Sequence, residues 1–206
     1  NAEEHTAKVF SSGESFGYGN KELRRAAMSG VPMEMVKVDA LRRGFREKES
    51  AIAWSGDAAH SIVGVFDNPN IPQDQAPLNA GATSRLWADK TPDEILDDIS
   101  SITGSITDVT NDVHEANTLC LPIAQYNIIA KKPRSATTDT TILGFIMDPK
   151  NGFGLDLVEK LPECKADGPG AEDVMLAYER DPEVLELRIP MEVQLLPPER
   201  RNLEFL

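Results

Sequence analysis

Cysteine, basic residues and long apolar runs are all scarce in this sequence. Its two cysteines, Cys120 and Cys164, have no nearby partners and indicate reduced thiols rather than a disulfide framework. Lysine and arginine number 21 against 34 acidic residues, and the resulting net charge of -13 argues against a nucleic-acid groove formed by the whole surface. No apolar run is long enough to span a membrane, and no signal peptide is visible. With 206 residues and 40% hydrophobic content, a real core is still expected.

Motifs with catalytic or metal-binding spacing are also missing. His60, His114, Cys120 and Cys164 do not stand at the spacing of metal ligands, so we expect no metal or cofactor. No G-x-S-x-G nucleophile motif occurs. Residues 17–21, GYGNK, precede a helix but lack the phosphate-loop pattern, and turn glycines explain them better.

Two polar groups remain as candidate chemistry. Asp57 and His60 follow the predicted end of a helix and could act as a base and the residue that orients it. We favour the alternative that Asp57 caps the turn and His60 is solvated. Four acidic residues early in a predicted helix could form a carboxylate pair like that of a glycosidase: Asp93, Glu94, Asp97 and Asp98. We favour a solvated acidic face instead, because acidic side chains near the start of a helix complement its dipole.

The N-terminal third predicts two helices behind an extended arm. Residues 2–16 are polar, with Val9, Phe10 and Phe16 as apolar points, and read as an arm or hairpin strand. Asn20 is a plausible N-cap for a helix over 21–29. A second helix over about 32–54 carries an apolar stripe at helical spacing: Met35, Val38, Leu41, Phe45 and Ile52.

Basic residues cover another part of this long helix, and glycine ends it. They alternate with Glu47 and Glu49, which favours a solvated or subunit-facing side over contact with nucleic acid: Arg42, Arg43, Arg46 and Lys48. Gly30 and Gly56 are the expected stops of the two helices. Trp54 is expected to be buried at the end of the long helix, as a packing anchor.

The rest of the chain predicts mixed elements. Residues 67–90 are rich in Pro, Asn and Gly and predict a loop. Thr91, Pro92 and Glu94 form a capping-box signature for a third helix. We further expect a buried strand at 118–121, a helix from Pro122 through 129, a short helix at 140–147, strands at 156–161 and 173–178, and a half-buried strand at 183–193. This order indicates the α+β class.

An ordered series of blocks resembles the major capsid proteins of tailed phages and prophages, of the Hong Kong 97 type. Residues 18–57, YGNKELRRAAMSGVPMEMVKVDALRRGFREKESAIAWSGD, are similar to the region of the spine helix in that family, and GVFDNPNI at 64–71 is similar to the segment that follows it. Further similar blocks stand at 87–99, 119–126 and 178–205. The resemblance covers nearly the whole chain.

The resemblance implies a capsid fold with a long spine helix, a peripheral domain with a sheet, and a mixed α/β axial domain. Residues 1–17 would be the returning strand of an extended loop that laps a neighbouring subunit, with Lys8, Val9, Phe10 and Phe16 in this intersubunit arm. Residues 18–86 and 173–206 would form the peripheral domain, with the spine helix at about 32–54, and residues 87–172 the axial domain. It also implies further segments before Asn1 and after Leu206.

The resemblance makes residues near the end of the spine helix a structural joint rather than a catalytic loop: Trp54, Gly56, Asp57 and Phe66. It implies a structural subunit and not an enzyme, which self-assembles into hexamers and pentamers of an icosahedral shell in the virion. The subunit would be made in the cytoplasm of the bacterial host. Its partners would be copies of itself, scaffold and portal proteins, and genomic DNA enclosed without sequence-specific binding; no membrane is involved.

Two alternatives stay open at this point. An encapsulin-like compartment would use the same fold to enclose a cargo enzyme instead of a genome. A hydrolase would use Asp57 and His60, and it would require a pocket in which these groups converge.

Overall fold

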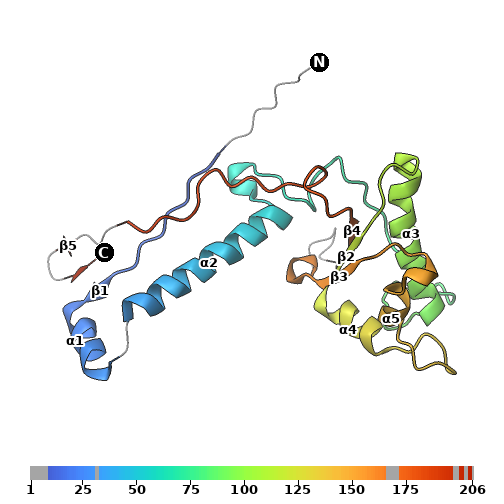
Figure 1. Ribbon diagram of the computed structural model, residues 1–206, viewed down its shortest axis with the longest axis horizontal. Coiled ribbons are helices and arrows are strands. Elements are labelled where there is room, and N and C mark those ends of the chain that lie inside the picture. Colours follow the sequence, from blue (N-terminus) through green and yellow to red (C-terminus); the bar gives the residue numbers. More distant parts are fainter. Residues whose placement is uncertain (1–8, 31–32, 166–171, 197–199, 202–203, 206) are drawn as a thin grey trace, which may run out of the picture. The chain divides into compact units, whose positions relative to one another are not determined.

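The computed structural model describes residues 9–30, 33–165, 172–196, 200–201 and 204–205. The chain divides into two compact units, which are treated separately below. Unit 1 comprises Asn1–Gly64 and Leu187–Leu206, and unit 2 comprises Val65–Glu186. Figure 1 shows long helical and extended segments in unit 1 and helices around a small sheet in unit 2. Together they make an α+β protein, as the sequence predicted.

Unit 1 is built on two helices. The strand β1 (Tyr18–Gly19) leads into α1 (Asn20–Ser29), and α2 (Met33–Ser55) follows after a short connection. At the other end of the chain, β5 (Arg200–Arg201) and β6 (Glu204–Phe205) form an antiparallel pair, and β6 also pairs with β1. The Lys37 ammonium on α2 donates to the Gly17 carbonyl at 2.8 Å and so ties α2 to the approach to β1.

Both helix predictions in unit 1 are confirmed, with one correction at a cap. Asn20 is the first residue of α1 rather than its N-cap, which is Gly19 in extended backbone without a side-chain cap. Gly30 ends α1 in the left-handed region at φ 69°, where glycine has no Cβ to clash. The helix α2 spans 23 residues, one residue later at each end than expected.

The apolar stripe of α2 is less covered than its pattern predicts. Val38, Leu41, Phe45 and Ile52 are only half-buried, and Met35 is 65% exposed. Among the residues that the structure describes in unit 1, no hydrophobic side chain is buried. The described part of unit 1 therefore has secondary structure without a hydrophobic core.

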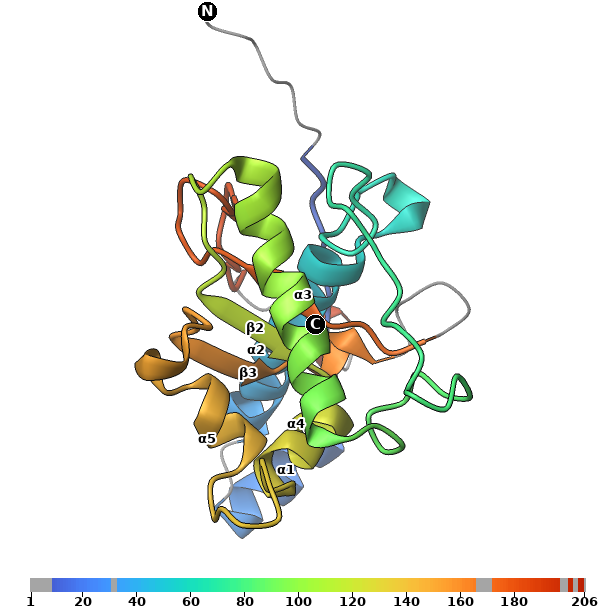
Figure 2. The ribbon, with the colours of Figure 1, turned by 90° about the vertical axis from the view of Figure 1, so that its right-hand side faces the viewer.

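Unit 2 holds the core. Its sheet has the order β3 (Leu157–Lys160), β2 (Thr118–Leu121), β4 (Leu176–Tyr178), with β2 parallel to β3 and antiparallel to β4. The helices α4 (Ile123–Lys131) and α5 (Ile142–Ile146) lie in the crossover that the parallel pair requires. In Figure 2, the longer helix α3 (Pro92–Thr110) lies against this sheet. All four residues of the central strand β2 are buried, as predicted.

The hydrophobic core of unit 2 joins α3 to the sheet and to the two crossover helices. Isoleucine dominates it because α3 places branched side chains at intervals of about one turn on the face toward the sheet. The side chains with almost no exposure are Ile95, Ile99, Leu119, Leu121, Ile129, Ile142 and Ile146. Ile102 and Ile106 continue the same face of α3 and are partly buried against the cluster.

An ion pair is enclosed beside this core. Lys90 Nζ lies 2.6 Å from Asp98 Oδ2, and both side chains are almost fully buried, at 1% and 2% exposure. The indole Nε1–H of Trp87 also donates to Asp98 Oδ2, at 2.9 Å. The Lys132 ammonium donates to the carbonyl of Lys90. This network fixes the loop before α3 onto the second turn of the helix.

The capping box at the start of α3 is present as predicted. Thr91 Oγ1 accepts from the backbone N–H of Glu94, and the Glu94 carboxylate accepts from the backbone N–H of Thr91 at 2.6 Å. The same carboxylate accepts from the backbone N–H of Ala80, at 2.5 Å. Glu94 therefore pins a distant part of the 67–90 loop to the helix, and these N–H groups, that of Thr91 foremost, lower its pKa.

The strand predicted at 183–193 is wrong. Residues 182–184 form a turn, and the structure assigns no strand from there to residue 196. A strand needs a neighbour to receive its backbone hydrogen bonds. Within the described part of the chain, no strand lies alongside this segment.

Breaking the buried ion pair from one side tests its contribution to stability. Asp98→Leu leaves the Lys90 charge buried and unpaired, and we expect it to lower the free energy of unfolding by about 3–5 kcal/mol. The double variant Lys90→Met/Asp98→Leu removes both charges and is expected to recover most of that loss. Urea unfolding followed by circular dichroism measures both variants. A double variant as unstable as the single one would contradict this account.

The capping carboxylate predicts a pH dependence. The pKa of Glu94 is lowered in the folded chain from its ordinary value of 4.5, so its contribution is present above that pH and is lost as the pH falls through the lowered pKa. We expect the urea midpoint of wild type to exceed that of Glu94→Gln at pH 7, and the difference to close below pH 4.5. A difference that stays constant down to pH 3 would show that Glu94 acts without its charge.

Candidate functional site

The end of α2 is a tight joint held by backbone hydrogen bonds. Gly56 follows the helix with φ 76°, and its N–H donates to the carbonyl of Ile52 at 3.0 Å. Asp57 and Ile62 then exchange two backbone hydrogen bonds, of 2.9 and 3.0 Å, around the short helix Ala58–His60. The predicted glycine stop at residue 56 is confirmed, and the chain reverses direction directly after it.

Two glycines allow this joint to close. A Cβ at Gly64 would lie 2.3 Å from the Gly56 nitrogen and 2.3 Å from the Trp54 carbonyl oxygen. A Cβ at Gly56 would lie 2.5 Å from the Ile62 carbonyl oxygen, in a backbone conformation that other residues rarely adopt. No side chain fits at either position without moving the backbone. The requirement for glycine at residue 64 was not predicted from the sequence.

Asp57 and His60 come together as a turn rather than as a catalytic pair. The Asp57 carboxylate accepts from the backbone N–H of Ala59 at 3.0 Å, and its Oδ2 lies 2.7 Å from His60 Nδ1. The hydrogen bond with His60 is the main reason that the pKa of Asp57 is lowered. His60 is exposed, with its ring centroid 5.1 Å from that of Phe10 in the arm. Asp57 thus caps the turn, and His60 provides a contact for the arm.

The two aromatic residues expected at the joint differ in their environments. Trp54 is half-buried, short of the full burial expected. Phe66 belongs to unit 2 and is buried, and its carbonyl accepts from Gln73 Nε2 at 2.6 Å.

The arm is extended and lies over α2. Val9 and Phe10 are exposed, Phe16 is half-buried, and Lys8 lies outside the described residues. A surface hollow separates the middle of the arm, at Ser12–Glu14, from the α2 residues Gly44, Phe45 and Lys48. The described part of the arm therefore follows the helix instead of standing away from it.

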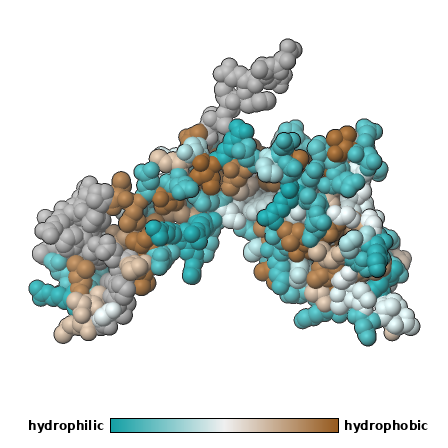
Figure 3. Space-filling model, in the orientation of Figure 1, coloured by the Kyte–Doolittle hydropathy of each residue, from teal (hydrophilic) through white to brown (hydrophobic). Residues whose placement is uncertain are grey.

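The C-terminal segment exposes a regular apolar pattern. From Leu185 to Leu195 every second residue is large and apolar, a period-2 pattern that predicts one buried face of a strand. All six of these side chains are exposed, from 40% at Leu185 to 68% at Met191. Figure 3 shows hydrophobic patches on the surface of unit 1. Exposed apolar patches of this kind mark interaction surfaces.

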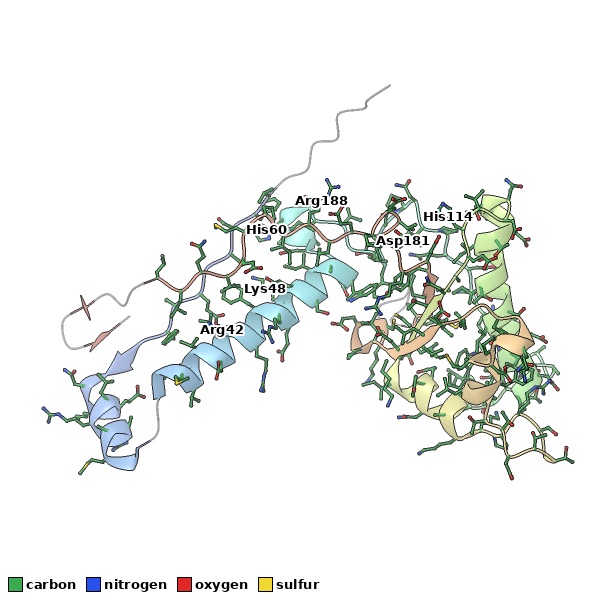
Figure 4. All side chains as sticks on the ribbon, viewed as in Figure 1. Arg42, Lys48, His60, His114, Asp181 and Arg188 are labelled. Carbon is green, nitrogen blue, oxygen red and sulfur yellow. The ribbon has the colours of Figure 1, made fainter. Side chains whose placement is uncertain are left out.

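The basic residues of α2 are exposed. Figure 4 labels Arg42 and Lys48 on α2, and places His60 and Arg188 above the C-terminal half of that helix. The basic cluster of α2 consists of Arg42, Arg43, Arg46 and Lys48. Among the described residues, none of these four forms an ion pair. These positive charges therefore face solvent in the isolated chain.

The acidic residues of α3 do not converge. Asp98 points inward to Lys90, whereas Asp97 is exposed, and Asp93 pairs with Arg134 at 2.5 Å. A hollow along α3 is bordered by Ser100, Gly104 and the loop at Asn151–Gly154, and Glu115 contributes its only carboxylate. The arrangement a glycosidase needs, two carboxyl groups facing one substrate, is not formed by these residues.

The histidine and cysteines of unit 2 are structural. His114 Nδ1 lies 2.5 Å from Glu179 Oε2 and links the loop after α3 to the end of β4. Burial raises the pKa of the Cys120 thiol to about 11, so this thiol stays protonated and unreactive near neutral pH. Cys164 is also buried. Within the described ranges, no group of three or more His, Cys, Asp or Glu residues is arranged to hold a metal ion.

Among the described helices, none combines the length and the apolar character that crossing a membrane requires. The conspicuous surfaces are instead the extended arm, the exposed faces of α2 and the apolar C-terminal segment. Exposed apolar side chains on such surfaces are typical of places where protein chains contact one another.

The fold is that of a phage capsid protein. It is similar to "The capsid of Myoviridae Phage XM1", with a TM-score of 0.76 and 15% sequence identity. The match covers 92% of this chain and 63% of that one, so the chain spans less than two thirds of the phage XM1 chain. No match was found among curated proteins.

The family model described as "Major capsid protein" matches residues 1–206, and the chain belongs to this family. By its family it is a structural protein of the virion capsid. The sequence resemblance and the expected α+β capsid fold are confirmed.

A pair of glycine substitutions tests the joint. Gly64→Ala places a Cβ against backbone atoms, and we expect it to destabilise the turn by about 1–3 kcal/mol, the usual range for overpacking. Gly44→Ala is the matched control, because its Cβ meets no atom within 4 Å and alanine favours the helix by about 1 kcal/mol. Hydrogen exchange at the Asp57 and Ile62 amides reports on the turn. Faster exchange is expected in Gly64→Ala alone, and unchanged exchange there would refute the close approach.

Proposed function

We propose that this chain is the repeating subunit of an icosahedral phage or prophage shell, assembled from hexamers and pentamers around the DNA genome. The observation that carries the proposal is the absence of any buried hydrophobic side chain among the described residues of unit 1. The helix α2 and the extended segments around it must gain their stability elsewhere. Contacts with other copies supply it, because burial of apolar surface is the main favourable term in association as in folding.

A stable interface requires a large buried surface. Standard interfaces bury ~1,600 Å² in total, and obligate ones bury more and are more hydrophobic. An arm over a long helix, beside a segment with six exposed apolar side chains, offers an elongated surface of that kind. Repeated copies with closed symmetry then give rings, and rings give a shell.

The domain roles inferred from the resemblance are part of the same proposal. Residues 1–17 would lap a neighbouring subunit, residues 18–86 with 173–206 would form the peripheral domain, and residues 87–172 the axial domain. The glycine joint at Gly56 and Asp57 would end the spine helix. The two compact units of the chain divide after Gly64 and after Glu186, which supports a two-part subunit with boundaries different from these.

The acidic balance suits a shell around DNA. A genome must be contained and later released, and a strongly basic lumen would hold it through its phosphates. Scaffold and portal proteins would be further partners during assembly. The DNA inside purified particles distinguishes this function from that of an encapsulin-like compartment, whose particles would contain a cargo protein.

Two exposed residues of the C-terminal segment provide a test. Ile189→Asn/Met191→Asn should leave the stability of the monomer within ~0.5 kcal/mol, because both side chains are already exposed, but should abolish assembly of the full-length protein if they form the interface. The matched control is Val109→Asn/Val113→Asn, which changes two apolar residues of unit 2 that are even more exposed, at 72% each. Light scattering and negative-stain microscopy measure assembly.

The expected result is shells for wild type and the control, and small species for the Ile189/Met191 variant. A wild-type protein that remains a monomer at every concentration and salt would refute the shell function. Normal shells from the Ile189/Met191 variant would instead refute only the assignment of this segment to the interface.

A further inference from the structure

The net charge of the chain is located entirely in one of its two units. Unit 1 contains twelve acidic and twelve basic residues and is formally neutral. Unit 2 contains 22 acidic and nine basic residues, so the whole charge of -13 belongs to it. The unit without a core is thus neutral, and the unit with the core is strongly acidic.

Contacts inside unit 2 compensate few of its acids. Lys90 neutralises the buried Asp98, Arg134 pairs with Asp93, and Arg180 with Glu159. On the outer side of α3, Asp97 and Asp108 are both exposed. They stand eleven residues apart, which is close to three full turns, so they share one face of the helix. Unit 2 therefore presents uncompensated negative charge to solvent.

Charge on two copies costs free energy only where the copies come close. Exposed charges are screened beyond ~10 Å at 0.1 M salt, so repulsion reports on the surfaces that lie within that distance of each other. Two units of zero net charge have no net repulsion of this kind. Two units of -13 repel strongly, because Coulomb energy grows with the product of the charges.

We propose that the electrostatic barrier to shell assembly lies in unit 2. Neighbouring copies bring their unit 2 surfaces within a screening length of each other, and dissolved cations must screen this repulsion before the shell closes. Contacts made through unit 1 carry no repulsion from net charge, so salt acts on them only through local charges such as those of the basic cluster. The inference rests on the proposed assembly function. It goes further by naming unit 2 as the part of the chain that makes assembly depend on ionic strength.

Two variants with the same net charge separate this proposal from an effect of total charge. Asp97→Asn/Asp108→Asn removes two charges from α3 in unit 2, and Asp39→Asn/Glu47→Gln removes two exposed charges from α2 in unit 1. Both variants carry -11. The full-length protein is titrated with NaCl, and the salt concentration at half-maximal light scattering is measured, with circular dichroism confirming the fold of each variant.

The expected result is a lower salt midpoint for the unit 2 variant alone. Reducing the charge of each unit 2 from -13 to -11 removes roughly 30% of the repulsion between two copies, and the midpoint should fall by about a third. The unit 1 variant should keep the wild-type midpoint or need slightly more salt, because it turns a neutral unit positive.

The outcomes separate the inference from the function on which it rests. Equal shifts in the two variants, or no shift in either, would overturn the location of the barrier while leaving assembly intact. Absence of assembly at every salt concentration in wild type and in both variants would overturn the shell function, and the inference with it. A lower salt midpoint for the unit 1 variant alone would place the barrier in unit 1 and refute the proposal.

Discussion

The distribution of buried hydrophobic surface governs the rest of this structure. The described core lies wholly within unit 2, where α3 packs its isoleucines against a small mixed sheet. Unit 1 has a 23-residue helix and extended segments but no buried hydrophobic side chain among those described. A helix in water gains most of its stability from packing, and the described part of unit 1 buries little of α2, so we propose that other copies cover it. This dependence gives a capsid subunit a reason to associate.

Local order in unit 1 is instead imposed by backbone geometry. Gly56 and Gly64 approach so closely that neither accepts a Cβ, and paired hydrogen bonds between Asp57 and Ile62 close the turn. Such a joint fixes where α2 ends without requiring a core around it. The contact of His60 with Phe10 brings the arm to the same place. The residue pair that resembled a base and its orienter is therefore explained by the architecture, and no catalytic role is needed for it.

The buried and the exposed charges of unit 2 have different consequences. Lys90 and Asp98 are desolvated together with Trp87, so they fix the loop before α3 and contribute nothing to the field outside. The remaining excess of acids faces solvent and gives the chain its charge of -13. A subunit with one neutral and one acidic part combines surfaces that associate readily with surfaces whose approach depends on ionic strength.

Local patterns determined much of this protein from the sequence alone. The capping box at Thr91 and Glu94, the glycine ends of α1 and α2 and the buried strand β2 follow from interactions within a few residues, and all are confirmed. The ordered blocks also pointed to the capsid family. Tertiary structure decided the rest, because it depends on partners distant in sequence. The alternation at 185–195 could not reveal that no strand among the described residues pairs with this segment. The sequence could not distinguish the buried Asp98 from the exposed Asp97, because Lys90 is placed beside Asp98 only by the fold. Gly64 has its role only because the chain folds back onto Gly56.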